Sequence, residues 1–247
     1  LLVRIANGHY TTRDFSAGSL RHALELYVLH FPVYRTYIDA NGPSATDRAL
    51  IDATIAQAQA RWPGAERSIF DFLQDVLTNM KGAAPGRSRI RRFALKVQQF
   101  TGPLMAKSLE DTAFYRYPRL LAFNEVGGDP ASNGLSIGSF HAALSRRQTT
   151  LPHGLTATAT HDTKRGEDAR ARLTALPELA GEWNTCVQHW RNLNKQHIQS
   201  SDSGRSPSPA LEYLLYQSLA GSWPLEPDAS FLERFKAYAI KAAREGK

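Results

Sequence analysis

Cysteine is almost absent from this sequence of 247 residues, and its scarcity excludes several kinds of protein. Cys186 stands alone, so the chain can form no internal disulfide and contains no Cys-x-x-Cys metal pair. The eight histidines show neither a His-Glu-x-x-His pair nor a comparable zinc spacing. We therefore expect a cytoplasmic protein that binds no metal and needs no cofactor.

Long apolar runs and several catalytic motifs are also missing. No apolar stretch approaches the ~20 residues needed to cross a membrane, so we expect no membrane partner. Gly127-Gly128 is not followed by Gly-Lys-Ser/Thr, and no Gly-x-Ser-x-Gly motif is present, which excludes a phosphate-binding loop and a nucleophile elbow. The N-terminus lacks both a methionine and the layout of a secretory signal, which predicts a chain cut from a longer polypeptide.

What the chain does contain is a mixed, basic composition. Hydrophobic residues make up 42%, enough to bury a sizeable core in one large or two small domains. A net charge of +7 permits a nucleic-acid partner, but acidic residues are interspersed throughout. The tight basic clusters at Arg146-Arg147 and residues 89–92 are typical of solvated helix faces. We therefore expect no nucleic-acid partner.

Hydrophobic spacing predicts a mainly helical chain with few strands. Strand-like residues occur at 31–38 and again at 155–160. Pro103 should bend or break a helix, and the polar segment 200–209 should be turn-rich and mobile. Ser68 is expected to be the N-cap of a helix at 68–80, which residues 82–86 should end, and a capping box at Ser230 should open the last helix. The other helices are expected at residues 18–30, 46–58, 90–100, 139–147, 177–197 and 211–219.

The most informative segment is residues 155–173, where a β-branched run ends abruptly in His161-Asp162. This pattern predicts a strand that delivers the pair at its carboxyl end, with a helix behind it. In barrels of alternating strands and helices, these strand ends carry the chemistry. A buried carboxylate beside an imidazole, with Lys164 and Arg165 just beyond, suits a sugar whose transition state is cationic. The alternative is a structural His–Asp hydrogen bond after a strand.

Two further segments carry side chains suited to binding sugars. Residues 98–117 place a lysine, two adjacent carboxylates and several aromatic rings within a short space; the candidates are Lys107, Glu110, Asp111, Tyr115 and Tyr117. Aromatic faces stack on pyranose rings, whereas carboxylates and lysine bind hydroxyl groups. An amphipathic helix with ordinary surface charges is the alternative. Residues 123–130 form a turn with an acidic edge, which by itself is more typical of an ordinary loop.

Taken together, these segments resemble the maltooligosyltrehalose synthases of the α-amylase superfamily. The likeness covers nearly the whole chain, because the order and rough spacing of the similar stretches agree with that family. These stretches are residues 31–37, 102–117, 124–130, 158–172 and 212–219, followed by Trp223-Pro224. Gly166 stands where a serine is expected, and Ser108-Leu109 where glycine and valine are expected; these are loop or helix-surface changes.

The resemblance implies a fold that is mainly α with a few short strands. It would be the C-terminal part of an α-amylase-type (β/α)8 barrel plus a helical insertion. A complete barrel needs eight strands, and this sequence offers two or three. The implied regions are a barrel helix and strand at 1–39, a helical subdomain at 40–154, a barrel strand and following helix carrying His161-Asp162 at 155–175, and a C-terminal helical region at 176–247.

The resemblance also implies an activity. The family is an intramolecular transferase, a (1→4)-α-D-glucan 1-α-D-glucosylmutase of trehalose biosynthesis. It relinks the reducing-end α-1,4-bonded glucose of a maltooligosaccharide as an α,α-1,1 terminus, with retention through a covalent glucosyl-enzyme. Its aspartate nucleophile and glutamate acid/base lie in segments that this sequence does not contain. The implied partners are the maltooligosaccharide and the N-terminal remainder of the same barrel, and the chain alone should be inactive.

Individual residues take roles from the same resemblance. Asp162 matches a second aspartate of the family, which holds sugar hydroxyls and strengthens its grip in the transition state. His161 would bind the same glucose, and Lys164 and Lys107 would reach the released glucose as it turns over. The other residues expected to bind substrate are Arg165, Glu110, Asp111, Tyr115 and Tyr117.

Two other hypotheses stay open at the level of sequence. The chain could be a stand-alone helical carbohydrate-binding or scaffolding module, or a basic helical nucleic-acid binder. An upstream barrel half in the same reading frame would favour the enzyme over the module. Retention on heparin or DNA that collapses steeply with salt would favour the nucleic-acid binder.

Overall fold

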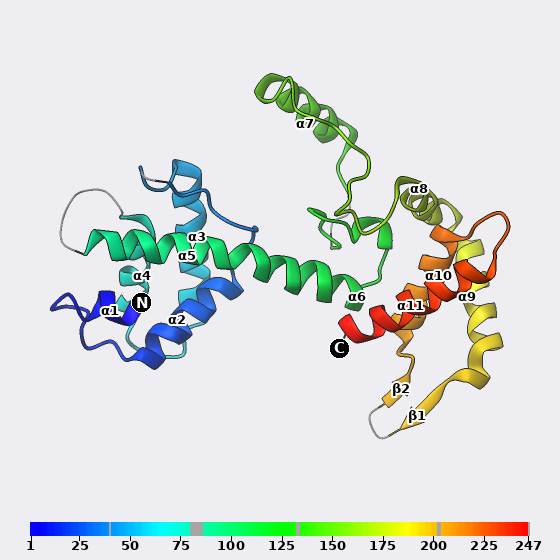
Figure 1. Cartoon of the computed structure of the whole chain (residues 1–247), viewed down its shortest axis with the longest axis horizontal. Helices are drawn as coiled ribbons and strands as arrows, with labels where there is room; N and C mark the ends of the chain where they lie inside the picture. The colour runs from blue at the N-terminus through cyan, green and yellow to red at the C-terminus, as the bar shows by residue number, and fades with distance from the viewer. Residues whose placement is uncertain (40, 80–85, 132–133, 202–203, 247) are drawn as a thin grey trace. The chain divides into compact units, whose positions relative to one another are not determined.

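A computed structural model describes residues 1–39, 41–79, 86–131, 134–201 and 204–246 of the chain (Figure 1). The described residues are mainly helical, as the sequence predicts, with two short strands. They form two compact units, Leu1–Lys107 and Ser108–Lys247, each with its own buried cluster. None of the described helices is long and apolar enough to cross a membrane.

Serine side chains start two helices of the N-terminal unit. Ser16 Oγ accepts a hydrogen bond from the Ser19 N–H at 3.0 Å, and Ser44 Oγ accepts one from the Asp47 N–H at 3.0 Å. The Asp47 carboxylate completes a capping box on Ser44. These bonds satisfy N–H groups that a helix start leaves without an intrahelical partner. The helices are α1 (Leu2–Ala6), α2 (Ala17–Leu29), α3 (Ala45–Ala60), α4 (Ser68–Thr78) and α5 (Arg87–Met105).

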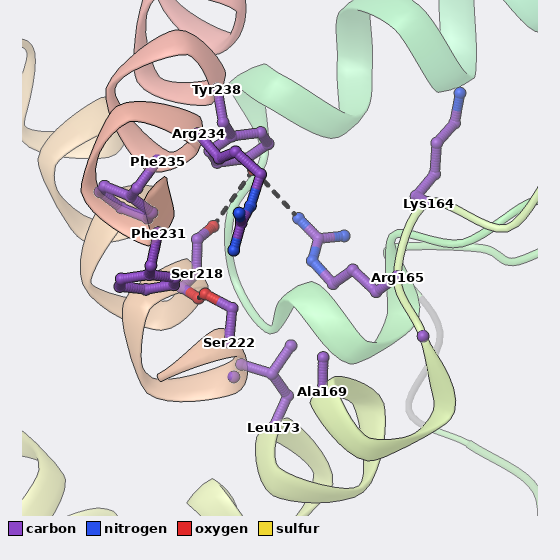
Figure 2. A pocket seen from close by; sticks show the side chains of 12 residues that line it. Lys164, Arg165, Ala169, Leu173, Ser218, Ser222, Phe231, Arg234, Phe235 and Tyr238 are labelled. Atoms are coloured by element: carbon purple, nitrogen blue, oxygen red, sulfur yellow. Dashed lines mark hydrogen bonds between the residues drawn. The ribbon is translucent and has the colours of Figure 1, made fainter. Parts of the chain in front are cut away.

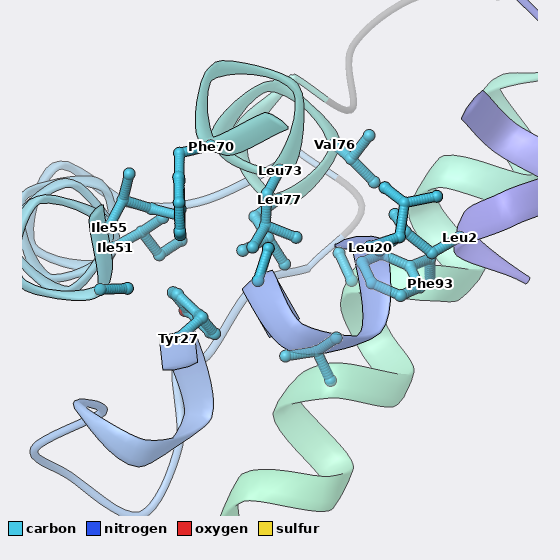
Figure 3. Close-up of a cluster of buried hydrophobic side chains, with 14 of the residues drawn as sticks. Leu2, Leu20, Tyr27, Ile51, Ile55, Phe70, Leu73, Val76, Leu77 and Phe93 are labelled. Carbon is cyan, nitrogen blue, oxygen red and sulfur yellow. The ribbon is translucent and has the colours of Figure 1, made fainter. Parts of the chain in front are cut away.

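The core of the N-terminal unit gathers on one face of α4 (Figure 3). Phe70, Leu73 and Leu77 recur at helical spacing and are at most 2% exposed. They belong to one cluster with Ile51 of α3 and Tyr27 of α2. Burying each large apolar side chain stabilises the fold by about 1.5–3 kcal/mol, so this cluster holds α2, α3 and α4 together.

The strand predicted at residues 31–38 does not form. Its backbone finds no ladder partner among the described residues, and a side chain takes the place of a neighbouring strand. Gln98 Oε1 accepts from the Ile38 N–H at 2.9 Å and from Thr36 Oγ1 at 3.1 Å, and Gln98 Nε2 donates to the Ile38 carbonyl at 3.1 Å. The extended segment is therefore fastened to α5 by one buried amide.

The helix does not break at Pro103, where a bend or a break was predicted. Helix α5 continues through Pro103 to Met105, and the chain then widens into the π-helix η1 (Ala106–Ala113), followed by α6 (Phe114–Arg116). Proline lacks the N–H that would bond four residues back, so the regular ladder is already interrupted before the wider turn begins. The helix end predicted at residues 82–86 lies mostly outside the described residues.

Four elements of the C-terminal unit, η2, α8, α10 and α11, pack around a smaller cluster. The cluster consists of Leu121, Leu173, Leu214 and Ala242, which come from four different elements. A Cβ at Gly221 would lie 3.3 Å from the Ala169 carbonyl oxygen, so glycine permits the close approach of α10 to α8. The helices are η2 (Leu121–Phe123), α7 (Ile137–Thr150), α8 (Glu167–Ala175), η3 (Leu176–Leu179), α9 (Ala180–Asn194), η4 (Lys195–His197), α10 (Pro209–Ser222) and α11 (Ala229–Glu245).

Strands and helix starts in the C-terminal unit differ from the prediction. Residues 155–160 form no strand, since no described segment pairs with them. The two described strands, β1 (Gln199–Ser201) and β2 (Gly204–Ser206), instead pair antiparallel in the segment predicted to be turn-rich and mobile. Helix α11 is capped by Asp228, which accepts from the Phe231 N–H at 2.7 Å, and not by Ser230.

Helix α4 of the N-terminal unit also begins differently, because Arg67 occupies the N-cap position and Ser68 is the first helical residue. In both helices the periodic pattern locates the helix but not its first residue. In α11 the Asp228 side chain reaches an N–H group and sets the first turn, whereas the Arg67 side chain makes no capping hydrogen bond in α4.

Candidate functional site

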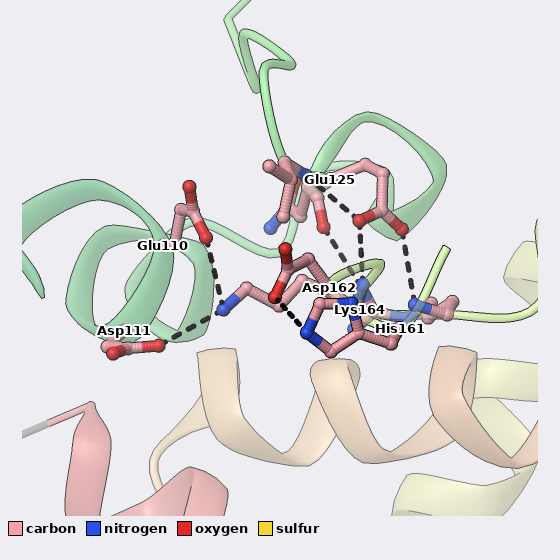
Figure 4. A network of polar contacts seen from close by, with 9 residues as sticks. Glu110, Asp111, Glu125, His161, Asp162 and Lys164 are labelled. Carbon is pink, nitrogen blue, oxygen red and sulfur yellow. Dashed lines mark hydrogen bonds and ion pairs between the residues drawn. The ribbon is translucent and has the colours of Figure 1, made fainter. Parts of the chain in front are cut away.

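Lys164 joins two distant segments of the C-terminal unit (Figure 4). Its ammonium nitrogen lies 3.1 Å from Asp111 Oδ1 and 3.3 Å from Glu110 Oε2. Burial alone would lower the pKa of Lys164, but the hydrogen bonds to Asp111 and Glu110 outweigh it and raise the pKa. The lysine therefore keeps its positive charge beside two carboxylates, as the charged form is the one that these partners favour.

Local structure explains why these groups meet. Glu110 and Asp111 are adjacent in the π-helix η1, where the wider turn follows Pro103. Lys164 comes directly after a turn in which the Thr163 N–H donates to the Thr160 carbonyl at 3.2 Å. Sequence analysis selected all three charged residues, and the structure brings them together.

Glu125 is a residue of this site that sequence analysis did not select. Its Oε1 accepts from the Lys164 N–H at 2.6 Å, and its Oε2 accepts from the Arg165 N–H at 3.1 Å. The only signal in the sequence was the acidic edge of residues 123–130, which does not reveal a partner about 40 positions away. Glu125 thus binds the main chain at Lys164 and Arg165, while the Lys164 side chain binds Glu110 and Asp111.

The Arg165 guanidinium contacts other residues of the C-terminal unit. Its Nη1 donates to the Asn124 carbonyl at 3.2 Å and to the Leu121 carbonyl at 3.4 Å, and its Nη2 lies 3.5 Å from the Tyr238 hydroxyl. The Tyr238 hydroxyl is also 3.1 Å from Ser218 Oγ. Arg165 therefore holds η2 and α11 near the loop, in addition to the sugar contact predicted for it.

A pocket of about 370 Å³ opens beside Lys164 and Arg165 (Figure 2). Its walls combine basic groups, hydroxyls and aromatic rings, so it offers hydrogen-bond donors next to apolar faces. The lining includes Ser218, Ser222, Phe231, Arg234, Phe235 and Tyr238.

His161 and Asp162 lie together on the surface of the C-terminal unit. His161 Nε2 is 3.3 Å from Asp162 Oδ1, and the two side chains are 92% and 72% exposed. The prediction of a buried carboxylate is therefore wrong for the described chain, because residues 151–162 are exposed along their whole length. The turn at residues 160–163 does place both side chains on one side, as a shared ligand would require.

The remaining predicted residues differ in their surroundings. Tyr115 is half-buried against the C-terminal cluster, and this burial raises the pKa of its hydroxyl, with Tyr238 adding to the effect. Tyr117 is 44% exposed, and its carbonyl accepts from Asn124 Nδ2 at 3.0 Å. Lys107 is exposed and is the last residue of the N-terminal unit. The site described within the C-terminal unit therefore contains Glu110, Asp111, Glu125, His161, Asp162, Lys164 and Arg165.

A second charged cluster surrounds Glu212 on α10. Glu212 Oε2 accepts from Arg205 Nη2 at 2.6 Å, and Oε1 accepts from the Tyr216 hydroxyl at 2.8 Å. Burial would raise the pKa of Glu212, but the hydrogen bonds from Arg205 and Tyr216 outweigh it and lower the pKa. The stretch around Glu212, which contributed to the resemblance, thus fastens the β1–β2 hairpin to α10.

Comparison with known proteins identifies relatives along the whole chain. No family model matches it. Curated proteins from two strains of Mycobacterium tuberculosis, named as maltooligosyl trehalose synthases, are 36% identical over 218 residues, which is 82% of the chain. This chain is a relative of the maltooligosyltrehalose synthases. It spans 27% of the length of those curated proteins, so they contain much that this sequence lacks.

Solved structures of maltooligosyltrehalose synthases support the same relationship. The enzyme from Arthrobacter ramosus aligns with 99% of the chain at 35% identity and a TM-score of 0.71, and the chain covers 28% of it. A hypothetical maltooligosyl trehalose synthase from Sulfolobus tokodaii aligns with 99% of the chain at 28% identity and a TM-score of 0.65, and the chain covers 30% of it. The family resemblance inferred from the sequence is confirmed.

Proposed function

We propose that this chain is the C-terminal portion of a maltooligosyltrehalose synthase, which isomerises the reducing-end α-1,4 bond of a maltooligosaccharide to an α,α-1,1 bond. The observation that supports this most is the 36% identity over 218 residues to proteins of that name. Because the chain spans 27% of their length, the proposed activity belongs to a longer polypeptide. Its remainder would supply the barrel, the nucleophile and the acid/base.

In the proposed reaction, this chain holds the glucose while groups elsewhere break and form the bond. Positive charge develops at the anomeric carbon as the α-1,4 bond cleaves, and a carboxylate at Asp162 attracts that state more strongly than the neutral sugar. His161 adds a hydrogen bond to the same glucose. The exposure of both side chains in the described chain is compatible with substrate contact.

Lys164 is proposed to retain the released glucose between the two steps. The glucosyl-enzyme must be attacked by the anomeric hydroxyl of that glucose, which has to turn over without leaving; attack by water gives hydrolysis instead. Two of the three ammonium donors point to Asp111 and Glu110, so the lysine is held in place while it meets a sugar hydroxyl. Arg165, Tyr115 and Tyr117 are proposed to line the same region, and Lys107 is also proposed to bind the substrate.

Maltopentaose tests the proposed function directly. The polypeptide that includes the missing barrel should convert it to a non-reducing product with a trehalose end, whereas the 247-residue chain alone should produce none. The physical reason is that the bond-breaking nucleophile and acid/base lie outside this sequence. Loss of reducing ends and chromatography of the products measure the reaction. Non-reducing product formed by the pure chain above a buffer control would contradict the proposal.

Replacing Lys164 by alanine should shift the complete enzyme from isomerisation toward hydrolysis. Without the point charge on its hydroxyls, the released glucose escapes more often before it is relinked. We expect the ratio of free glucose to trehalose-ended product to rise several-fold, ~1 kcal/mol of lost discrimination. Lys236→Ala is the matched control, because Lys236 is exposed on α11 and pairs with Glu233. An unchanged product ratio in Lys164→Ala would remove Lys164 from this role.

A further inference from the structure

The Glu125 carboxylate collects three backbone N–H groups. In addition to Lys164 and Arg165, the Val126 N–H donates to Glu125 Oε1 at 2.9 Å. Hydrogen bonds to a charged acceptor are stronger than those between neutral groups. Glu125 therefore binds the main chain of the loop tightly at the two residues whose side chains reach the candidate site.

The main chain next to Glu125 is held by hydrogen bonds of Asn124. The preceding residue, Asn124, is 1% exposed, and its Nδ2 donates to the Phe114 carbonyl at 2.8 Å and to the Tyr117 carbonyl at 3.0 Å. Asn124 thereby ties the end of η2 to the end of the helical segment that carries Glu110 and Asp111. A displacement of Glu125 relative to those carboxylates would break these buried bonds.

The contacts form a closed ring in the C-terminal unit, and Figure 4 shows its links from Lys164 to Glu110, Asp111 and Glu125. Glu110 and Asp111 lie on the helical segment that ends near Phe114, and Asn124 bonds to the Phe114 carbonyl. The next residue, Glu125, binds the main chain of Lys164. The Lys164 ammonium closes the ring by donating to Asp111. Arg165 reinforces it, because its guanidinium donates to the Asn124 carbonyl beside Glu125. Within this ring, Glu125 is the link that binds the main chain of Lys164. The long side chain of lysine could reach the carboxylates from several backbone positions, so the ion pairs alone do not fix that main chain.

We propose that Glu125 is the positioning residue of the candidate site, holding the loop at Lys164 and Arg165 so that the lysine faces the sugar and both carboxylates at once. Its effect on catalysis rests on the proposed function, whereas its effect on the loop does not. Glu125 contacts no substrate in this role; it acts through Lys164.

The loop effect can be measured on the 247-residue chain without any substrate. In Glu125→Ala, amide hydrogen exchange at Lys164 and Arg165 should speed up by on the order of 10-fold or more, because both N–H groups lose a charged acceptor. The pKa of the Lys164 ammonium, followed by carbon-13 labelling of lysine, should fall toward its ordinary value. Glu125→Gln, which keeps one acceptor oxygen, should show a smaller change, and it replaces the alanine variant if that one does not fold.

Asp129→Asn is the matched control. It removes one carboxylate charge from the same loop, but Asp129 bonds locally to the Ala131 N–H at 2.9 Å. Unchanged exchange at Lys164 and Arg165 in a folded Glu125 variant would overturn the proposal, as would an equal change in Asp129→Asn.

The effect of Glu125 on catalysis is measured in the complete enzyme. Glu125→Ala should raise the ratio of free glucose to trehalose-ended product in the same direction as Lys164→Ala. This ratio does not depend on how much of the enzyme is folded, so it can be measured even if the melting temperature falls. The double variant should show no further rise, because Glu125 acts through Lys164. Independent, additive effects would overturn the positioning role. If the unmodified enzyme makes no trehalose-ended product, the proposed function fails, and the exchange result still decides the loop contact.

Discussion

Turnover of the complete enzyme should fall by on the order of 10³-fold or more when Asp162 is replaced by asparagine, ~4 kcal/mol of transition-state stabilisation. Asparagine keeps the size of the side chain and one acceptor oxygen but has no negative charge. Charge matters most as the glucosyl centre becomes cationic, so the loss is concentrated in the transition state and not in substrate binding. Folding should be preserved, because the Asp162 side chain is 72% exposed and contacts His161 at the surface.

His161→Ala provides the comparison for Asp162→Asn. It removes a neutral hydrogen bond, worth about 0.5–1.5 kcal/mol, so turnover should fall by much less than in Asp162→Asn. Steady-state kinetics on both variants, with melting curves alongside, measure the difference. Near-normal turnover of Asp162→Asn with unchanged melting would leave the His–Asp pair with a purely structural role.

The free energy of unfolding of this chain should fall by about 3–5 kcal/mol when Phe70 is replaced by alanine. The Phe70 side chain is 0% exposed and packs edge-on against Trp62, with ring centroids 5.5 Å apart. Truncation removes the transfer free energy of the ring and leaves a cavity between α3 and α4 that neighbouring side chains fill only in part. The loss approaches the total stability of many single domains.

Phe100→Ala is the control for this core variant. Phe100 lies on α5 and is 59% exposed, so its truncation should cost less than about 1 kcal/mol. Urea unfolding followed by circular dichroism measures both variants in the same chain. Equal losses in Phe70→Ala and Phe100→Ala would show that the cluster on α4 is not the core of the N-terminal unit.

Most of the helices could be predicted from the sequence, because they bury one face at a regular spacing, although α7 has no buried residue. The stripe on α4 and the runs that became α2, α9 and α10 are local patterns, and a local pattern is enough to specify a helix whose hydrogen bonds are all internal. The first residues of α4 and α11 were less predictable. Asp228 caps α11 in place of Ser230, and α4 begins at Ser68 after Arg67, whose side chain makes no capping hydrogen bond.

The strands could not be predicted in the same way. Residues 31–38 and 155–160 have strand-like composition, yet a strand exists only where another backbone offers its hydrogen bonds. In the N-terminal unit the Gln98 side chain takes that place for the first segment. The strands β1 and β2 form from polar residues because two extended stretches that are close together in the sequence pair antiparallel.

By itself, the sequence determined that this protein is mainly helical, that its charged and aromatic residues gather in three segments, and that those segments resemble maltooligosyltrehalose synthases. Only the tertiary structure decided that Lys164 pairs with Asp111 and Glu110, that Glu125 holds the backbone of the same loop, and that His161 and Asp162 are exposed. Residue types and their spacing show which chemical groups lie along the chain. Which groups meet across some 40 to 50 positions depends on the packing of η1, η2 and α8, which no local pattern encodes.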